Sequence, residues 1–148
     1  ALERIASWVK LRDRKTQRVF MMVNTHFDHV GHTARQESAK LIMRKIEEIV
    51  GTNPAFVTGD FNITEANAVY QTMVTNEFRM LDAFHITDWH HGTQHTFHDF
   101  CRIPRQQCVK IDFIFVTPNV RVTDTFILPD NADCQLSDHN PHWADLVF

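Results

Sequence analysis

The apolar positions in the first 25 residues predict a strand, a turn and a second strand. Residues 2–11 alternate between two faces, with Ile5 and Val9 on the same one. A polar stretch follows at residues 12–18, and residues 19–25 are then largely apolar on both faces. An apolar run on both faces is typical of a strand in the middle of a sheet. We therefore expect the second strand to be central and buried.

From residue 33 onward the apolar period changes from two to between three and four, which predicts a helix. Thr33 and Gln36 have the spacing of a capping box at its N-terminus, and Gly51 is placed to end it. The apolar residues at helical spacing are Ala39, Ile42, Ile46 and Ile49.

The remaining elements are shorter. Residues 55–58 are typical of a buried strand, and residues 64–74 of a second helix with Ala66, Val69, Tyr70 and Met73 facing inward. Three further strands are expected at residues 110–116, 120–128 and 142–148. Between residues 81 and 109 only Thr96–Phe97 resembles a strand, and we assign no role to the histidines from His85 to His98.

This order of strands and helices predicts the fold class α/β in the broad α+β sense. We expect a two-layer α/β sandwich with mainly antiparallel or mixed sheets, because strict alternation of strand and helix, typical of a doubly wound fold, is absent. The 148 residues, 43% of them hydrophobic, suit one domain spanning residues 1–148. No apolar run approaches the length of a membrane span.

The charge balance bears on the class of partner. The net charge is −3 and the isoelectric point is near 6.4. Tight non-specific binding of long nucleic acid usually needs a basic stripe that displaces counterions. A small phosphate ester or a short nucleotide is therefore a better candidate ligand than duplex DNA.

The three cysteines are Cys101, Cys108 and Cys134, without Cys-x-x-Cys spacing. An odd count favours reduced thiols over a disulfide framework. A bridge between Cys101 and Cys108 across a loop is the alternative, and the cellular location stays open.

Four short blocks place His, Asp or Asn near the ends of apolar runs. They are Asn24-Thr25-His26, Gly59-Asp60-Phe61-Asn62, Ile111-Asp112-Phe113-Ile114-Phe115 and Ser137-Asp138-His139-Asn140-Pro141. A single block of this kind is more often a turn or a cap, because Asp and Asn bond locally to the backbone. Four of them can converge on one phosphate and one divalent cation, which is typical of a hydrolase.

In this order the blocks resemble the endonuclease/exonuclease/phosphatase superfamily, which includes pancreatic deoxyribonuclease, neutral sphingomyelinases and inositol-phosphate phosphatases. The resemblance runs from about Ile5 to Phe148 and implies a deoxyribonuclease I-like fold. The first block, followed by Ala34-Arg35 and Ser38-Ala39, is most similar to bacterial members of uncertain substrate.

The resemblance also implies that only the second half of the fold is present. Superfamily members carry an Asn and a metal-binding Glu before the Asn-Thr-His block, and Glu3 lies in the strand region leading to that block, so it does not fit this role. We expect the chain to need the missing N-terminal half or a partner chain.

The implied catalytic residues are His26, Asp60, Asn62, Asp112 and His139. Asp60 would orient or deprotonate the attacking water, and Asn62 would donate to a phosphate oxygen or help to fix the metal-bound site. The alternative for this pair is an Asx-turn that leads to a helix cap. Asp112 can hold one ring nitrogen of His139 and raise its basicity, although a water-facing strand residue is the alternative.

Asp138 is the expected metal ligand, because hard cations such as Mg²⁺ or Mn²⁺ favour carboxylate oxygen. His26, Asn62 and Arg35 are the expected substrate-binding residues. His26 could instead be a strand-end residue with a backbone partner, and Arg35 a surface residue of the helix. A zinc site of His26, His29 and His32 is disfavoured by its spacing and the lack of a fourth ligand.

The implied activity is hydrolysis of a phosphomonoester or phosphodiester by in-line attack of water, with Mg²⁺ or Mn²⁺ as cofactor. The partner is a phosphate-ester substrate, with nucleotides and nucleic acids among the candidates. The alternative is a catalytically silent binding or scaffolding module that retains the fold. The presence of five ionisable site residues argues against that alternative.

Overall fold

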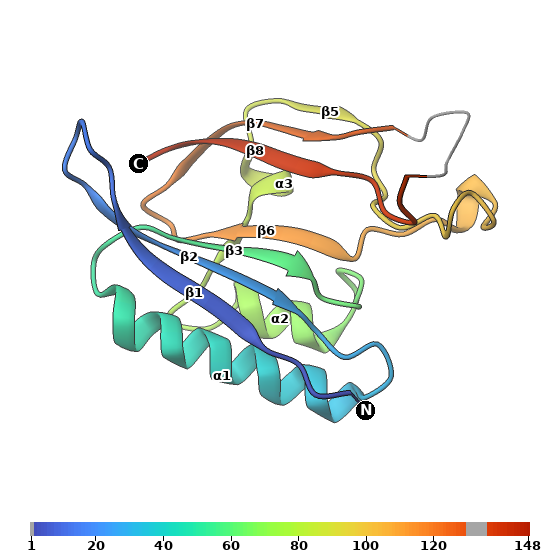
Figure 1. Cartoon of the computed structure of the whole chain (residues 1–148), viewed down its shortest axis with the longest axis horizontal. Coiled ribbons are helices and arrows are strands. Elements are labelled where there is room, and N and C mark those ends of the chain that lie inside the picture. The colour runs from blue at the N-terminus through green and yellow to red at the C-terminus, as the bar shows by residue number, and fades with distance from the viewer. Residues whose placement is uncertain (1, 130–135) are drawn as a thin grey trace.

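The computed structural model describes residues 2–129 and 136–148, which form two sheets and the helices that flank them (Figure 1). The larger sheet has the order β1 (Ala6–Arg12), β2 (Val19–His26), β3 (Ala55–Asp60), β6 (Asp112–Val116), β4 (Leu81–Asp82). The smaller sheet has the order β5 (His90–Gly92), β7 (Arg121–Ile127), β8 (His142–Val147). The helices are α1 (His32–Val50), α2 (Ala68–Val74) and α3 (Ala83–Ile86), with a 3₁₀ turn at Arg105–Gln107.

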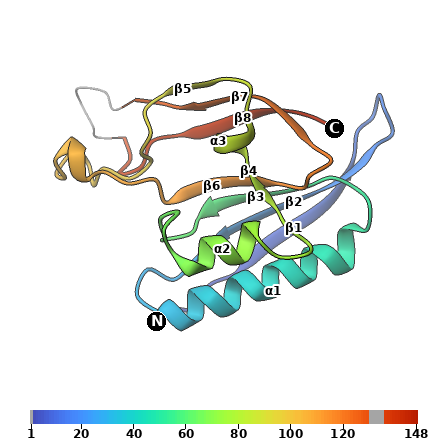
Figure 2. The ribbon, with the colours of Figure 1, turned by 180° about the vertical axis from the view of Figure 1, so that it is seen from behind.

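The elements form layers. Helices α1 and α2 cover one face of the larger sheet, and the smaller sheet lies on its other side, with α3 between the two sheets (Figure 2). Strands β2 and β3 are parallel, whereas β1 with β2 and β3 with β6 are antiparallel. The predicted α/β class with mixed sheets is confirmed.

Two apolar cores hold the layers together. The first joins α1 and α2 to the sheet, and its aromatic rings include Phe61 packed edge-on to Phe113 and Phe115. The second lies between the sheets and includes Phe56, with Phe20 and Phe148 packed against it. Burial of apolar side chains on both faces explains why β3 and β6 lack polar alternation until their ends reach the site.

The predicted capping box at Thr33 and Gln36 is wrong. Helix α1 begins at His32 with Gly31 as its N-cap, and the backbone N–H of Gly31 donates to the carboxylate of Asp28 at 2.7 Å. Because Asp28 already fixes the chain there, the helix starts before Thr33, which is exposed.

The second helix and the irregular region also differ from expectation. Helix α2 begins at Ala68 because the side chain of Asn67 accepts from the N–H of Val69 at 2.9 Å, and Ala66, expected inside, is exposed. Residues 81–109 contain β4, α3 and β5, which are too short to show a period in the sequence. The short strand expected at Thr96–Phe97 is reduced to isolated bridges of Phe97 with Val109 and His139.

The expectation of reduced cysteines is wrong for Cys101, which is disulfide-bonded. The alternative bridge between Cys101 and Cys108 is also wrong, because Cys108 keeps a thiol directed at the carbonyl oxygens of Ile103 and Pro104. Cys134 lies outside the described residues. Among the described residues, no helix is long and apolar enough to cross a membrane.

Candidate active site

Strand pairing places three of the predicted site residues in one row. Parallel β2 and β3 set His26 opposite Asp60, and antiparallel β3 and β6 set Asp60 opposite Asp112. Gly59 makes this close pairing feasible, because its φ is 151° and a Cβ there would lie 1.9 Å from the carbonyl oxygen of Thr25. Gly59 therefore allows the end of β3 to lie close to β2, which brings the carboxylate of Asp60 beside the neighbouring strand.

The carboxylate of Asp60 is held on two sides. Its Oδ1 accepts the backbone N–H of Asn62 at 2.8 Å, and its Oδ2 lies 3.3 Å from Nε2 of His26. Burial raises the pKa of Asp60, and the charge of Asp112 raises it further, against the lowering effect of the Asn62 N–H and of the imidazoles. The predicted local turn is thus present, and it fixes a carboxyl group whose pKa is raised by burial.

Asn62 has a left-handed backbone, with φ at 50°, and its side-chain amide donates to the carbonyl of Phe27 at 3.0 Å. This bond ties the loop after β3 to the loop after β2. The two loops that follow His26 and Asp60 are therefore fixed to one another.

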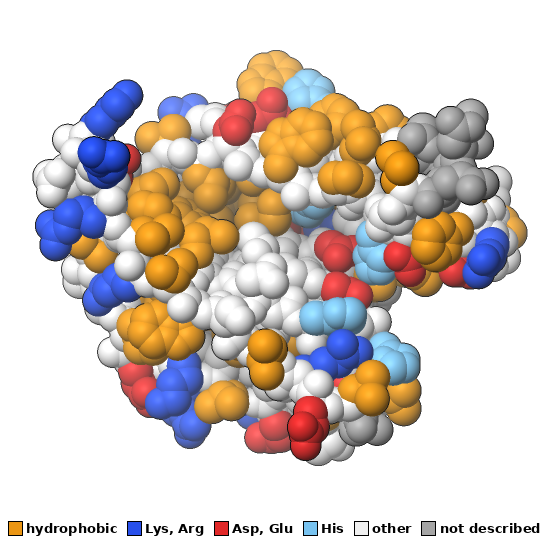
Figure 3. Space-filling view, in the orientation of Figure 1, with side chains coloured by type: hydrophobic (Ala, Val, Ile, Leu, Met, Phe, Trp, Pro, Cys, Tyr) orange, Lys and Arg blue, Asp and Glu red, His pale blue; other side chains and the backbone are white. Residues whose placement is uncertain are grey.

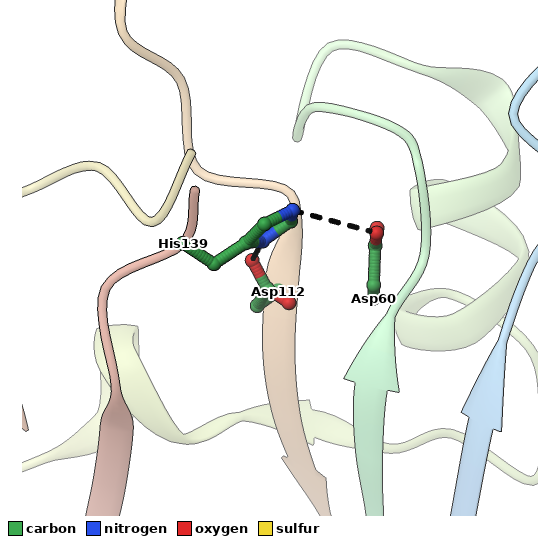
Figure 4. A group of neighbouring side chains, drawn as sticks. All are labelled: Asp60, Asp112 and His139. Carbon is green, nitrogen blue, oxygen red and sulfur yellow. Dashed lines mark hydrogen bonds and ion pairs between the residues drawn. The ribbon is translucent and has the colours of Figure 1, made fainter. Parts of the chain in front are cut away.

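His139 reaches the row from the segment that leads into β8 (Figure 4). Its Nδ1 lies 2.7 Å from Oδ2 of Asp112, and its Nε2 lies 3.9 Å from Oδ2 of Asp60. The hydrogen bond to Asp112 is the main reason why the pKa of His139 is raised, since burial acts in the opposite direction. The predicted Asp112–His139 pairing is present in the structure.

The site lies at one end of the two sheets. Figure 3 shows acidic and His side chains gathered there, beside a hollow between the layers, with apolar side chains over the opposite end. His26 is the exposed member, with 53% of its side chain accessible, whereas the side chains of Asp60 and His139 are 15% and 25% accessible. The carboxylates are sheltered while one imidazole stays open to solvent.

One group of side chains in the site could hold a cation. Asp60, Asp112 and His139 offer ligand atoms within 4.8 Å of one another. Two carboxylates suit a hard divalent cation. Among the described residues Asp138 belongs to no such group; it is half-buried, and its carbonyl oxygen accepts from the N–H of His98 at 3.0 Å.

A second acidic group contains Glu65, Asp82 and His85. Its charge is met by Lys110, whose Nζ lies 2.9 Å from carboxylate oxygens of both Glu65 and Asp82. The ammonium is buried and lies 4.4 Å from the centre of the Phe84 ring. Sequence reasoning missed Lys110, which stands two residues before Asp112 and anchors the chain that enters β6.

Arg35 and the zinc alternative have clear positions. Arg35 donates from its Nη1 to the carbonyl of Asp28 at 2.8 Å, which supports the loop that follows His26. His29 pairs with Asp28 at 3.8 Å, and His32 is exposed at the start of α1. Among the described residues, no metal-ligand group combines His26, His29 and His32.

Comparisons with known proteins show the family and the fold of the chain. The model of the Endonuclease/Exonuclease/phosphatase family matches residues 4–139. A Bacteroides vulgatus endonuclease/exonuclease/phosphatase structure is similar at 56% identity and TM-score 0.94, over 97% of this chain and 55% of that one. A Bacteroides thetaiotaomicron mannosyl-6-phosphatase is similar at 31% identity and TM-score 0.89, over 100% and 58% of the two chains.

The human Nocturnin catalytic domain with a bound sulfate anion shares the fold at 18% identity and TM-score 0.77, over 98% of this chain and 53% of that one. No curated protein sequence matches the chain. The chain spans a little more than half the length of the solved relatives described above.

Proposed function

Because the chain belongs to the Endonuclease/Exonuclease/phosphatase family, we propose that it is the larger part of a divalent-metal-dependent phosphoesterase. The reaction is hydrolysis of a phosphate ester by in-line attack of water. The observation that carries this proposal is the convergence of Asp60, Asp112 and His139, from three separate segments, at one end of the sandwich.

Asp60 orients the attacking water. Its carboxylate is fixed by the Asn62 N–H, and a water must be held within hydrogen-bond reach of both its base and the phosphorus. The raised pKa of Asp60, caused chiefly by burial, makes this carboxylate a better proton acceptor than an exposed one. Asn62 holds the loop after His26 through its bond to the Phe27 carbonyl, and it contributes to binding of the substrate phosphate.

His139 and His26 transfer protons and contact phosphate oxygens. Asp112 accepts from Nδ1–H of His139 and so directs Nε2 toward Asp60. His26 lies on the opposite side of Asp60 and is exposed, which leaves its imidazole accessible to the leaving oxygen of a substrate. Arg35 supports the loop after His26 through its bond to the Asp28 carbonyl, and its proposed part in substrate binding rests on the resemblance to the family.

The carboxylates of the site are suited to Mg²⁺ or Mn²⁺. Asp138, although it lies outside the group of Asp60, Asp112 and His139, is proposed to hold the ion together with these carboxylates, and a bound cation would supply positive charge beside the phosphoryl oxygens. Oxygen ligands favour these cations over zinc.

A small phosphate ester is the favoured substrate. The net charge of −3 disfavours a long polyanion, and the similar protein from Bacteroides thetaiotaomicron is a mannosyl-6-phosphatase. These two observations support a phosphorylated small molecule, such as a sugar phosphate, over nucleic acid.

The complete site is proposed to need the segment that precedes the matching part in its relatives. Apolar side chains are exposed on one outer strand of each sheet: Trp8 is 54% exposed on β1, and Trp143 is 47% exposed on β8. Edge strands with such side chains favour pairing or covering by further chain. That segment would also supply the expected Asn and Glu.

The test is a screen of phosphate esters with Mg²⁺, using the chain joined to its upstream segment. We expect hydrolysis of at least one small phosphate ester, and a loss of about a hundredfold or more in turnover for Asp60→Asn. The matched control is Asp145→Asn, an exposed carboxylate on β8 away from the site. Hydrolysis that survives Asp60→Asn unchanged would disprove the assigned role.

A further inference from the structure

The segment around Thr96 lies between the two chain segments that carry Asp112 and His139. On one side the N–H of Phe97 donates to the carbonyl of Val109 at 2.9 Å. On the other side the N–H of Asn140 donates to the carbonyl of Thr96 at 2.6 Å. Phe97 accordingly forms bridges with both Val109 and His139. Isolated β-bridges at Phe97 therefore join these three segments.

The hydroxyl of Thr96 fixes the first residues of β6. Its Oγ1 accepts the backbone N–H groups of Ile111 at 3.0 Å and Asp112 at 3.1 Å. A hydroxyl oxygen has two lone pairs, so both are used here. Thr96 is fully buried, and water cannot replace it as an acceptor.

The same residue therefore holds both members of the Asp112–His139 pair. Its hydroxyl fixes the backbone of Asp112, and its carbonyl fixes the residue after His139. The ring of Phe97 lies 5.0 Å from the imidazole of His139 and limits the positions that this ring can take.

A further backbone hydrogen bond connects Ile111 to the segment of the third site residue, Asp60. Ile111 donates its N–H to Thr96, and its carbonyl accepts from the N–H of Phe61 at 2.9 Å. Phe61 directly follows Asp60. Thr96 thus contacts the Asp112 segment through its hydroxyl and the His139 segment through its carbonyl, and it is connected to the Asp60 segment through Ile111.

We propose that Thr96 is a positioning residue, whose hydroxyl sets the placement of Asp112 relative to His139 and thereby the geometry of the reaction. This inference rests on the proposed phosphoesterase function for its kinetic consequence. Its structural consequence, the Asp112–His139 hydrogen bond, can be measured without any substrate.

The test compares three variants in the protein with its upstream segment. Thr96→Val keeps the shape of the side chain and removes the acceptor, whereas Thr96→Ser keeps the acceptor. Thr125→Val is the matched control, because Thr125 is equally buried and its hydroxyl has no hydrogen-bond partner among the described residues.

We expect Thr96→Val to lower kcat by about tenfold to a hundredfold with little change in KM, since a misplaced catalytic group costs about this much. Thr96→Ser should stay within about threefold of the parent protein in kcat, and so should Thr125→Val. Where Thr96→Val does not fold, Thr96→Cys, with a weak sulfur acceptor, should show a smaller loss of the same kind.

The second readout is the NMR signal of the His139 Nδ1 proton, which its bond to Asp112 protects from exchange with water. This signal should be lost or broadened in Thr96→Val and kept in Thr96→Ser and Thr125→Val. A Thr96→Val protein that is less stable but keeps both the signal and kcat would overturn the proposal. If no phosphate ester is hydrolysed by the parent protein while the signal follows this pattern, the proposed function fails and the positioning role stands.

Discussion

The Nδ1 atom of His139 lies 2.7 Å from Oδ2 of Asp112, although the two residues are 27 positions apart in the sequence. An ionised carboxylate can only accept, so Nδ1 carries the proton and Nε2 is the free nitrogen of the neutral ring. Figure 4 shows this second nitrogen directed at Asp60, at a distance of 3.9 Å. That distance is too long for a hydrogen bond, so His139 Nε2 and the carboxylate of Asp60 do not bond directly to each other.

Asp112→Asn should remove the main cause of the raised pKa of His139. Because the folded-state pKa lies above the ordinary value, the pair stabilises the protein fully below a pH of about 6.5 and loses this effect as pH rises through the raised pKa. We therefore expect Asp112→Asn to destabilise the protein most in mild acid. Denaturant unfolding of both proteins across this range measures the difference, and a difference that grows with pH would contradict the assignment.

His139→Ala should lower turnover by about a hundredfold to ten-thousandfold, the range that general acid–base groups supply. The control is His91→Ala, which removes an exposed imidazole whose ion-pair partner is Asp124, on β7. Steady-state rates with a phosphate ester found in the screen provide the measurement. Near-parental turnover in His139→Ala would end its assignment as a proton-transfer group.

A chelator should abolish hydrolysis, and Mg²⁺ or Mn²⁺ should restore it, because the acidic group of the site offers carboxylate oxygens. The rates before and after chelation, with each cation added back, give the test. Restoration by zinc alone would rule out the oxygen-ligand assignment.

Lys110→Met should destabilise the fold strongly. It leaves the carboxylate of Asp82, 3% exposed, without its ammonium partner, and breaking a buried pair costs about 3–5 kcal/mol in free energy of unfolding. Lys45→Met, which removes an exposed pair with Glu48, should have a much smaller effect, because solvent screens exposed ion pairs. Denaturant titration measures both variants, and equal effects would show that the Lys110 network adds nothing beyond a surface pair.

The sequence predicted the row of His26, Asp60 and Asp112 because each residue ends or begins an apolar run. Runs of this kind become neighbouring strands, and strand pairing then sets their ends side by side. The start of α1 could not be predicted in the same way. It depends on the carboxylate of Asp28, which also accepts from the distant N–H of Leu2, and such a bond leaves no local pattern.

Lys110 and Thr96 were missed for a related reason. Lys110 pairs with Asp82, 28 residues earlier, and Thr96 accepts from backbone groups 15 and 16 residues later. Periodicity reports which face of an element is buried, whereas these contacts depend on how irregular segments cross one another. A buried polar residue in such a segment is visible as important only when its partners are known.

His142 provides a separate prediction about pH and stability. Burial, together with the charge of Lys110, lowers the pKa of His142 from 6.5 to about 4, against the opposing charges of Asp82 and Asp112. The folded protein thus keeps this imidazole neutral at a pH where the unfolded chain binds a proton. Because the unfolded state binds more protons, the contribution to stability is lost as pH falls from about 6.5 toward 4.

The loss is about 1.4 kcal/mol for each unit of pKa difference, so about 3 kcal/mol at most near pH 4. We expect the free energy of unfolding to fall more steeply with acid in the parent protein than in His142→Leu, which has no group to protonate. Denaturant unfolding at several pH values between about 7 and 4 measures the two slopes. Parallel slopes would mean that His142 is already protonated in the folded protein, and that it is less well buried between the sheets than its position on β8 indicates.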